Sequence, residues 1–122
     1  MIVRLRAAPS AAARPPVGEP ERHLMRCRRR EEAADVLCAT VADGRDAARA
    51  RLLGCFRLTD SVEVRRVRHG LELTAVFDAD GLERDVLERR MLAATNGHAV
   101  RFGWARFPDD GLTLHALKEI AR

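Results

Sequence analysis

The chain has 122 residues, of which 47% are hydrophobic and 33% are charged, and its formal net charge at pH 7 is +4. This length provides room for one domain with one hydrophobic core. No apolar run approaches the roughly 20 residues of a membrane-spanning helix, which argues against a membrane protein. The basic balance permits an anionic partner but does not require one.

The first 20 residues are rich in Ala, Arg and Pro. We expect this segment to be a flexible leader, because its prolines oppose helix formation. The lack of acidic residues before Glu19 also resembles a transit peptide, which is the alternative interpretation. The folded part is expected to be a single domain over residues 21–122.

The three cysteines, Cys27, Cys38 and Cys55, are far apart and form no CxxC pair. Their spacing therefore indicates neither a zinc site nor a disulfide framework. We expect buried, reduced thiols in a cytoplasmic protein that has no metal or other cofactor.

Hydrophobic periodicity predicts three elements in the first half of the domain, in the order helix 21–34, strand 36–42 and helix 45–56. The strand is almost continuously apolar, which is typical of a strand covered on both faces. The inner stripe of the second helix consists of Ala48, Leu52, Cys55 and Phe56.

Residues 62–77 are expected to form a β-hairpin. Apolar and polar residues alternate along both arms, which is the period-two pattern of half-buried strands. We place the tip at His69 and Gly70, because glycine accepts the positive φ that a tight reversal requires.

The last elements are a helix from Leu82 to about Ala94, a strand over 99–107 and a helix over 112–121. Gly103 marks a bulge or a close backbone approach in that strand. The complete order is a helix, then β-α-β-β-α-β, then a helix. This order predicts an α+β, ferredoxin-like fold, with an antiparallel sheet that has helices on one face and an additional N-terminal helix.

The C-terminal third resembles the end of a GGDEF domain, the diguanylate cyclase fold. The similarity rests on the strand Arg101–Ala105 and on the turn Phe107–Gly111, and it extends over the chain from about Leu24. Upstream, Arg57 and Asp60 match the family's RxxD motif, the inhibitory site for cyclic di-GMP. The resemblance also places the family's signature hairpin tip at His69, Gly70, Leu71, Glu72 and Leu73.

The departures from the family pattern imply a degenerate, shortened domain. His69 stands in place of the first glycine, and Leu71 replaces the acid that helps to hold Mg²⁺. Only Glu72 remains of the acidic pair, whereas a phosphoryl-transfer site needs several oxygen ligands. The family's nucleotide-binding segments are also missing before Arg57. We therefore expect no enzyme activity.

The leading interpretation is a non-catalytic signalling domain that binds cyclic di-GMP through Arg57 and Asp60. Arg65 and Arg66 are expected to contribute to ligand binding by adding positive charge. The opposing interpretation of the motif is a local ion pair. Eight residues separate Asp60 from His69, whereas the family usually has five at the corresponding place.

Two further functions stay open. A protein–protein module or homodimer would use the exposed face and edges of the sheet, with Trp104 as a candidate anchor. A nucleic-acid-binding module would use the hairpin residues Arg65, Arg66, Arg68 and His69, together with the basic run Arg28–Arg30. We rank the nucleic-acid function last, because the sheet has few aromatic residues on which bases would stack.

Overall fold

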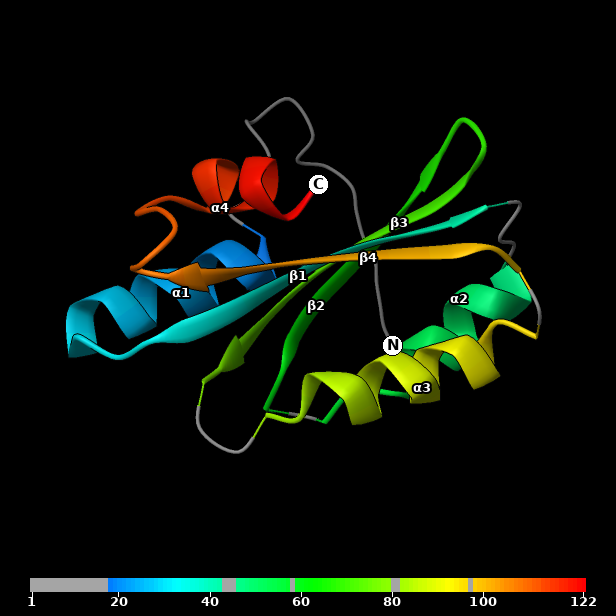
Figure 1. Cartoon of the computed structure of the whole chain (residues 1–122), viewed down its shortest axis with the longest axis horizontal. Helices are drawn as coiled ribbons and strands as arrows, with labels where there is room; N and C mark the ends of the chain where they lie inside the picture. Colours follow the sequence, from blue (N-terminus) through cyan, green and yellow to red (C-terminus); the bar gives the residue numbers. More distant parts are fainter. Residues whose placement is uncertain (1–17, 43–45, 58, 80–81, 97) are drawn as a thin grey trace, which may run out of the picture.

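The computed structural model describes residues 18–42, 46–57, 59–79, 82–96 and 98–122 (Figure 1). Residues 1–17 of the expected leader, which was predicted over residues 1–20, lie outside these ranges. Its last two residues, Glu19 and Pro20, belong to a helix, so the leader is shorter than predicted. The described elements, in chain order, are α1 (Glu19–Arg30), β1 (Ala34–Ala42), α2 (Asp46–Leu53), β2 (Ser61–Val67), β3 (Gly70–Asp78), α3 (Arg84–Ala94), β4 (Val100–Phe107) and α4 (Leu114–Ala121).

The four strands form one sheet in the order β2-β3-β1-β4, and every neighbouring pair is antiparallel. This topology confirms the predicted ferredoxin-like α+β fold with its additional N-terminal helix. β1 lies at the centre, paired with β3 on one side and with β4 on the other. Its residues 34–39 are all buried, which is the burial expected of a strand covered on both faces.

One face of the sheet packs against α2 and α3, the two helices of the predicted βαββαβ unit. The predicted inner stripe of α2 is confirmed, since Ala48, Leu52 and Cys55 are buried and Phe56 packs against the same core. Every second residue of each strand points to this face of the sheet and packs against the two helices. The buried side chains of this core from the strands are Leu37, Ala39, Val41, Val64, Leu71, Leu73, Ala75 and Phe77.

The opposite face of the sheet packs against α1 and α4 (Figure 1). Leu24 and Cys27 of α1 and Leu117 of α4 are buried against this face. The expectation of an exposed sheet face is therefore wrong for the part under these two helices. The terminal helices add a second apolar layer because β1 is apolar on both sides and requires cover on both.

α1 begins at Glu19 and ends at Arg30, so it starts earlier and stops earlier than predicted. Pro20 lies in its first turn, where a proline is tolerated because the N–H group there has no partner within the helix. Glu31 adopts a left-handed conformation with φ of 57°, and its backbone N–H caps the helix. Sequence periodicity cannot detect such a backbone reversal at a residue other than glycine or asparagine.

α4 approaches β4 so closely that only glycine fits at position 103. A Cβ atom on Gly103 would lie 2.5 Å from the carbonyl carbon of Ala121, which is far inside van der Waals contact. The predicted close approach at this glycine is thus confirmed. The apolar pattern of the last helix would place Ile120 toward the core, but that side chain is exposed and Ala121 is buried in its place.

The β2–β3 hairpin is closed by Arg68 and His69, and Val67 is paired with Gly70. The tip therefore lies one residue earlier than predicted. Gly70 nevertheless has a φ of 148°, in the region that residues with a side chain rarely adopt. Among the described residues, no helix combines the length and the apolar character needed to cross a membrane.

Replacing Gly70 with Val should strain the hairpin, because a β-branched side chain disfavours a positive φ. We expect Gly70→Val to lower the free energy of unfolding by about 1 kcal/mol or more. Urea denaturation of the variant and the wild type measures this difference. An unchanged midpoint would contradict the role given to Gly70.

Replacing Gly103 with Ala should force α4 away from β4, and overpacking of this kind typically costs about 1–3 kcal/mol of stability. Gly54→Ala is the matched control, because a Cβ there meets its nearest atom, the carbonyl oxygen of Arg51, at 3.4 Å. We expect the control to be neutral or slightly stabilising. Equal unfolding midpoints for the two variants would show that α4 has more room than the structure gives it.

Candidate functional site

The RxxD residues form a tight turn between α2 and β2. A carboxylate oxygen of Asp60 accepts a hydrogen bond from the backbone N–H of Arg57 at 2.8 Å, and the Arg57 carbonyl accepts one from the backbone N–H of Asp60 at 3.0 Å. The Asp60 side chain is only 6% exposed, whereas that of Arg57 is 61% exposed and lies 3.7 Å from the carboxylate. Asp60 thus organises the turn, and Arg57 projects from it.

A hollow of about 210 Å³ lies beside this turn. Arg57 and Arg90 lie on its wall, and Asp60 and Glu83 add opposing negative charges. The Arg90 guanidinium donates a hydrogen bond to the Cys55 carbonyl at 3.3 Å, which holds it near the end of α2. The apolar part of the lining is Phe77, Leu82, Val86 and Leu87. The hollow therefore offers two guanidinium groups over an apolar floor.

Arg65 and Arg66 lie near the other end of β2, roughly 15 Å along the strand from its first residue at about 3.3 Å per residue. As consecutive strand residues they point to opposite faces of the sheet. The Arg65 guanidinium makes an ion pair with Glu72 at 2.9 Å. The structure therefore does not bring these two arginines together with Arg57 and Asp60.

The residues that align with the GGDEF signature are divided between the two faces of the sheet. Leu71 and Leu73 are buried in the core under α2 and α3. Glu72 points to the opposite face, where its carboxylate accepts a hydrogen bond from Arg65 at 3.0 Å. His69 is exposed in the turn. The acid that remains in the signature is thus occupied by a neighbouring arginine.

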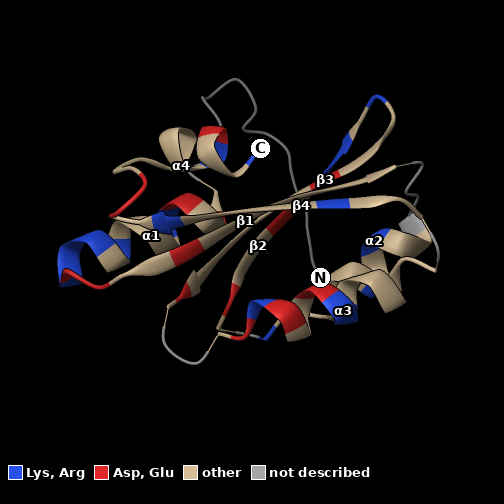
Figure 2. Ribbon diagram, in the orientation of Figure 1, with Lys and Arg blue, Asp and Glu red and all other residues tan. Residues whose placement is uncertain are grey.

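Basic residues gather at the C-terminal end of α1 and around the hairpin tip (Figure 2). Figure 2 also shows acidic residues on the strands and at the start of α3. On the face toward α1 and α4, one cross-strand row places the acidic Glu72 and the neutral Thr40 between Arg65 and Arg101. Such a row interrupts a positive field rather than extending it.

Asp35, at the start of β1, was not identified from the sequence. It is 1% exposed, and its carboxylate accepts hydrogen bonds from Arg84 at 2.7 Å and from Arg106 at 3.1 and 3.3 Å. The hydrogen bond to Asp35 raises the pKa of Arg106 above its usual value. The two ion pairs share the buried Asp35, and because the three residues come from β1, α3 and β4, they join three elements.

Trp104 lies within the same group of contacts. Its ring packs against Phe77, the Arg84 guanidinium lies 4.8 Å from the ring centroid, and the indole N–H donates to Glu88 at 2.7 Å. The ring is half-buried. Trp104 is therefore part of the core and of its polar rim, and it does not project as a free anchor for a partner.

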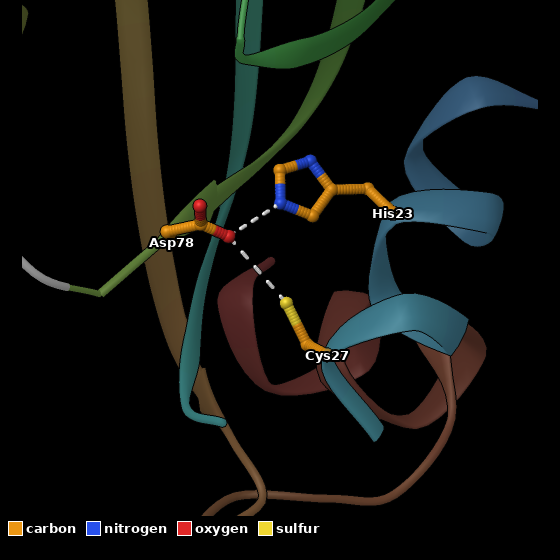
Figure 3. A group of neighbouring side chains, drawn as sticks. All are labelled: His23, Cys27 and Asp78. Atoms are coloured by element: carbon orange, nitrogen blue, oxygen red, sulfur yellow. Dashed lines mark hydrogen bonds and ion pairs between the residues drawn. The ribbon is translucent and has the colours of Figure 1, made fainter. Parts of the chain in front are cut away.

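A second polar cluster joins α1 to the sheet (Figure 3). One ring nitrogen of the buried His23 is 2.8 Å from the Ser61 hydroxyl, and the other is 2.8 Å from the Asp78 carboxylate. The Cys27 thiol donates to the same carboxylate oxygen at 3.6 Å. Sequence analysis missed this cluster, although a histidine and a cysteine four residues apart on the inner side of a helix were a signal that could have revealed part of it.

Burial and hydrogen bonding move the pKa values of two members of this cluster, Cys27 and Asp78, from their usual values. Loss of hydration, followed by the negative charge of Asp78, raises the pKa of Cys27 to about 11. The hydrogen bond from His23 lowers the pKa of Asp78. Cys27 is therefore a neutral thiol at pH 7, and Asp78 is a carboxylate.

Comparison with solved structures finds several chains of similar fold. The chain is similar to a sensory box/GGDEF family protein from Caulobacter crescentus, with a TM-score of 0.60 and 18% sequence identity, over 84% of this chain and 82% of that chain. The chain has a GGDEF-like fold. No protein-family model matches the sequence, and no curated protein matches it either.

Incubation with GTP and either Mg²⁺ or Mn²⁺ should yield no cyclic di-GMP. The reason is that Leu71 is a core residue and the Glu72 carboxylate is bound by Arg65, so the hairpin presents no pair of acids to a metal ion. Chromatographic analysis of the reaction measures the product. Product made by the wild type and lost in Glu72→Ala would overturn this prediction.

Proposed function

We propose that the protein is a non-catalytic, GGDEF-like signalling domain of the cytoplasm that binds cyclic di-GMP at the turn formed by Arg57 and Asp60. The observation that carries the proposal is the arrangement of this turn. Asp60 is buried and fixes the backbone of Arg57, while the Arg57 guanidinium is left exposed beside a hollow. An arginine whose backbone is already positioned loses less entropy when it binds a ligand.

The chemistry of the hollow suits a guanine nucleotide. Guanidinium groups bind phosphate oxygens through two parallel hydrogen bonds and stack on bases, and Arg57 and Arg90 both line the hollow. Its apolar residues offer a surface for one base. The volume of about 210 Å³ is below the roughly 300–1,000 Å³ of pockets for drug-sized ligands, so the rest of the dinucleotide would lie outside it.

The other functions have less support. The nucleic-acid function relied on the arginines of the hairpin, and Arg65 is paired with Glu72. The protein–protein function relied on an open sheet face and on Trp104, and α1 and α4 cover much of that face while Trp104 is bound within the fold. We therefore retain the cyclic di-GMP function as the proposal.

The expected affinity for cyclic di-GMP is in the micromolar range, or about −8 kcal/mol. Arg57→Ala should weaken binding by about tenfold to a hundredfold, because it removes a charge-assisted hydrogen bond worth roughly 1.5–3 kcal/mol. Isothermal titration calorimetry with the purified full chain measures both affinities.

Arg66→Ala is the matched control, since it removes the same charge at the far end of β2. We expect Arg66→Ala to change the affinity by less than a factor of about three, because salt screens a charge at that distance from the ligand. Absence of heat with the wild type at high micromolar protein, or equal losses in both variants, would refute the assignment of the site to this turn.

A further inference from the structure

Three side chains of different chemistry converge where α1 meets the end of β3. The nearest donor atoms of His23, Cys27 and Asp78 all lie within 4.8 Å of one another. His23 and Cys27 project from successive turns of α1 toward Asp78, which lies at the end of its strand (Figure 3). Within the described residues this is the one such group of three metal-binding side chains. We propose that it binds a divalent transition-metal cation such as Zn²⁺.

The donor set fits this class of cation. Imidazole nitrogen, thiolate sulfur and carboxylate oxygen are the common protein ligands of Zn²⁺, at about 2.0–2.3 Å. Ligand atoms at these distances in a tetrahedron are roughly 3.3–3.7 Å apart. The cysteine sulfur and the carboxylate oxygen are 3.6 Å apart, and the imidazole nitrogen and the same oxygen are 2.8 Å apart. Insertion of the ion requires the second pair to separate by about half an ångström. It also requires the imidazole nitrogen and the sulfur, which lie within 4.8 Å of one another, to approach to a tetrahedral separation.

The surroundings allow that small adjustment. Asp78 has a 69% exposed side chain, so its carboxylate can move, whereas His23 is 5% exposed and fixed. The Ser61 hydroxyl binds the second ring nitrogen of His23 at 2.8 Å. A partner of this kind sets the tautomer and orients the ring of a metal-binding histidine. Asp78 can therefore close on the ion, and the Cys27 side chain must turn toward the fixed imidazole to complete the ligand set.

Solvent reaches the cluster through a hollow of about 330 Å³. The hollow provides an entry path and an open fourth position, as in zinc sites that keep a water ligand. Its charged lining has more acids than bases, which favours a cation. The acids are Glu19, Glu32, Asp60 and Asp78, and the bases are Arg26 and Arg30.

Nucleophilic catalysis explains the cluster less well. Ser61, His23 and Asp78 form a hydrogen-bonded series like that of a hydrolase, but the serine is 5% exposed and the acid faces solvent, which is the reverse of what substrate access requires. Cys27 contacts Asp78 and not His23, so no base withdraws its proton. Its raised pKa agrees with an unreactive thiol in the metal-free protein.

Titration of the reduced, metal-free full chain with Co²⁺ tests the proposal, followed by competition with Zn²⁺. We expect one equivalent of Co²⁺ to produce a sulfur-to-cobalt charge-transfer band together with the strong visible absorption of a tetrahedral site. Zn²⁺ should abolish both signals, because it binds such sites more tightly than Co²⁺. Excess Zn²⁺ should also raise the melting temperature.

Three variants locate the site. Asp78→Asn, which keeps the size of the side chain and an oxygen that can accept a hydrogen bond, should weaken Co²⁺ binding at least tenfold. Ser61→Ala should weaken it about tenfold by freeing the His23 ring. Cys55→Ser, which changes a buried thiol outside the cluster, should leave the charge-transfer band intact. No charge-transfer band with the wild type at millimolar Co²⁺, or unchanged binding in Asp78→Asn, would overturn the proposal. Loss of the band in Cys55→Ser would do the same.

Discussion

The burial of β1 on both faces is the constraint on which the rest of this structure depends. A central strand with six consecutive buried residues cannot be covered by one layer of helices. α2 and α3 cover one side, and α1 and α4 cover the other. The terminal helices are therefore part of the core and not additions to a complete βαββαβ unit. At the start of the strand, the buried Asp35 is compensated by two arginines, without which its charge would be strongly destabilising.

Both candidate sites lie where a covering helix meets the sheet. The turn that presents Arg57 lies where the chain leaves α2 and enters the edge strand β2. The cluster of His23, Cys27 and Asp78 exists because α1 places its inner side against the ends of β2 and β3. At each site a polar side chain is buried by this packing and needs a hydrogen-bond partner. His23 finds its partners on distant strands, and Asp60 finds its partner within the same turn.

The elements and their order could be predicted from the sequence, because apolar periodicity and glycine-containing turns are local signals. The positive φ of Gly70 and the close approach at Gly103 were predicted for the same reason, although the hairpin tip lies one residue before the predicted place. The apolar run of β1 implied that helices cover both faces of the sheet. The apolar pattern of a helix, however, does not show which face of the sheet that helix covers. The grouping of Arg65 and Arg66 with Arg57 neglected the length of an extended strand. Asp35 and His23 have partners more than 35 residues away, which a single sequence does not reveal.

The ion pair between Arg65 and Glu72 also has a consequence for the alignment of the hairpin. A slip of β2 by two residues in one direction keeps every side chain on its own face but sets Glu63 directly opposite Glu72, where like charges repel. A slip by two in the other direction moves Arg65 opposite Thr74, so that the ion pair with Glu72 is lost. Apolar packing alone tolerates both shifts better than a shift by one residue, which would invert the strand. One charged pair beside the turn thus selects a single pairing from the alternatives that hydrophobic burial leaves open.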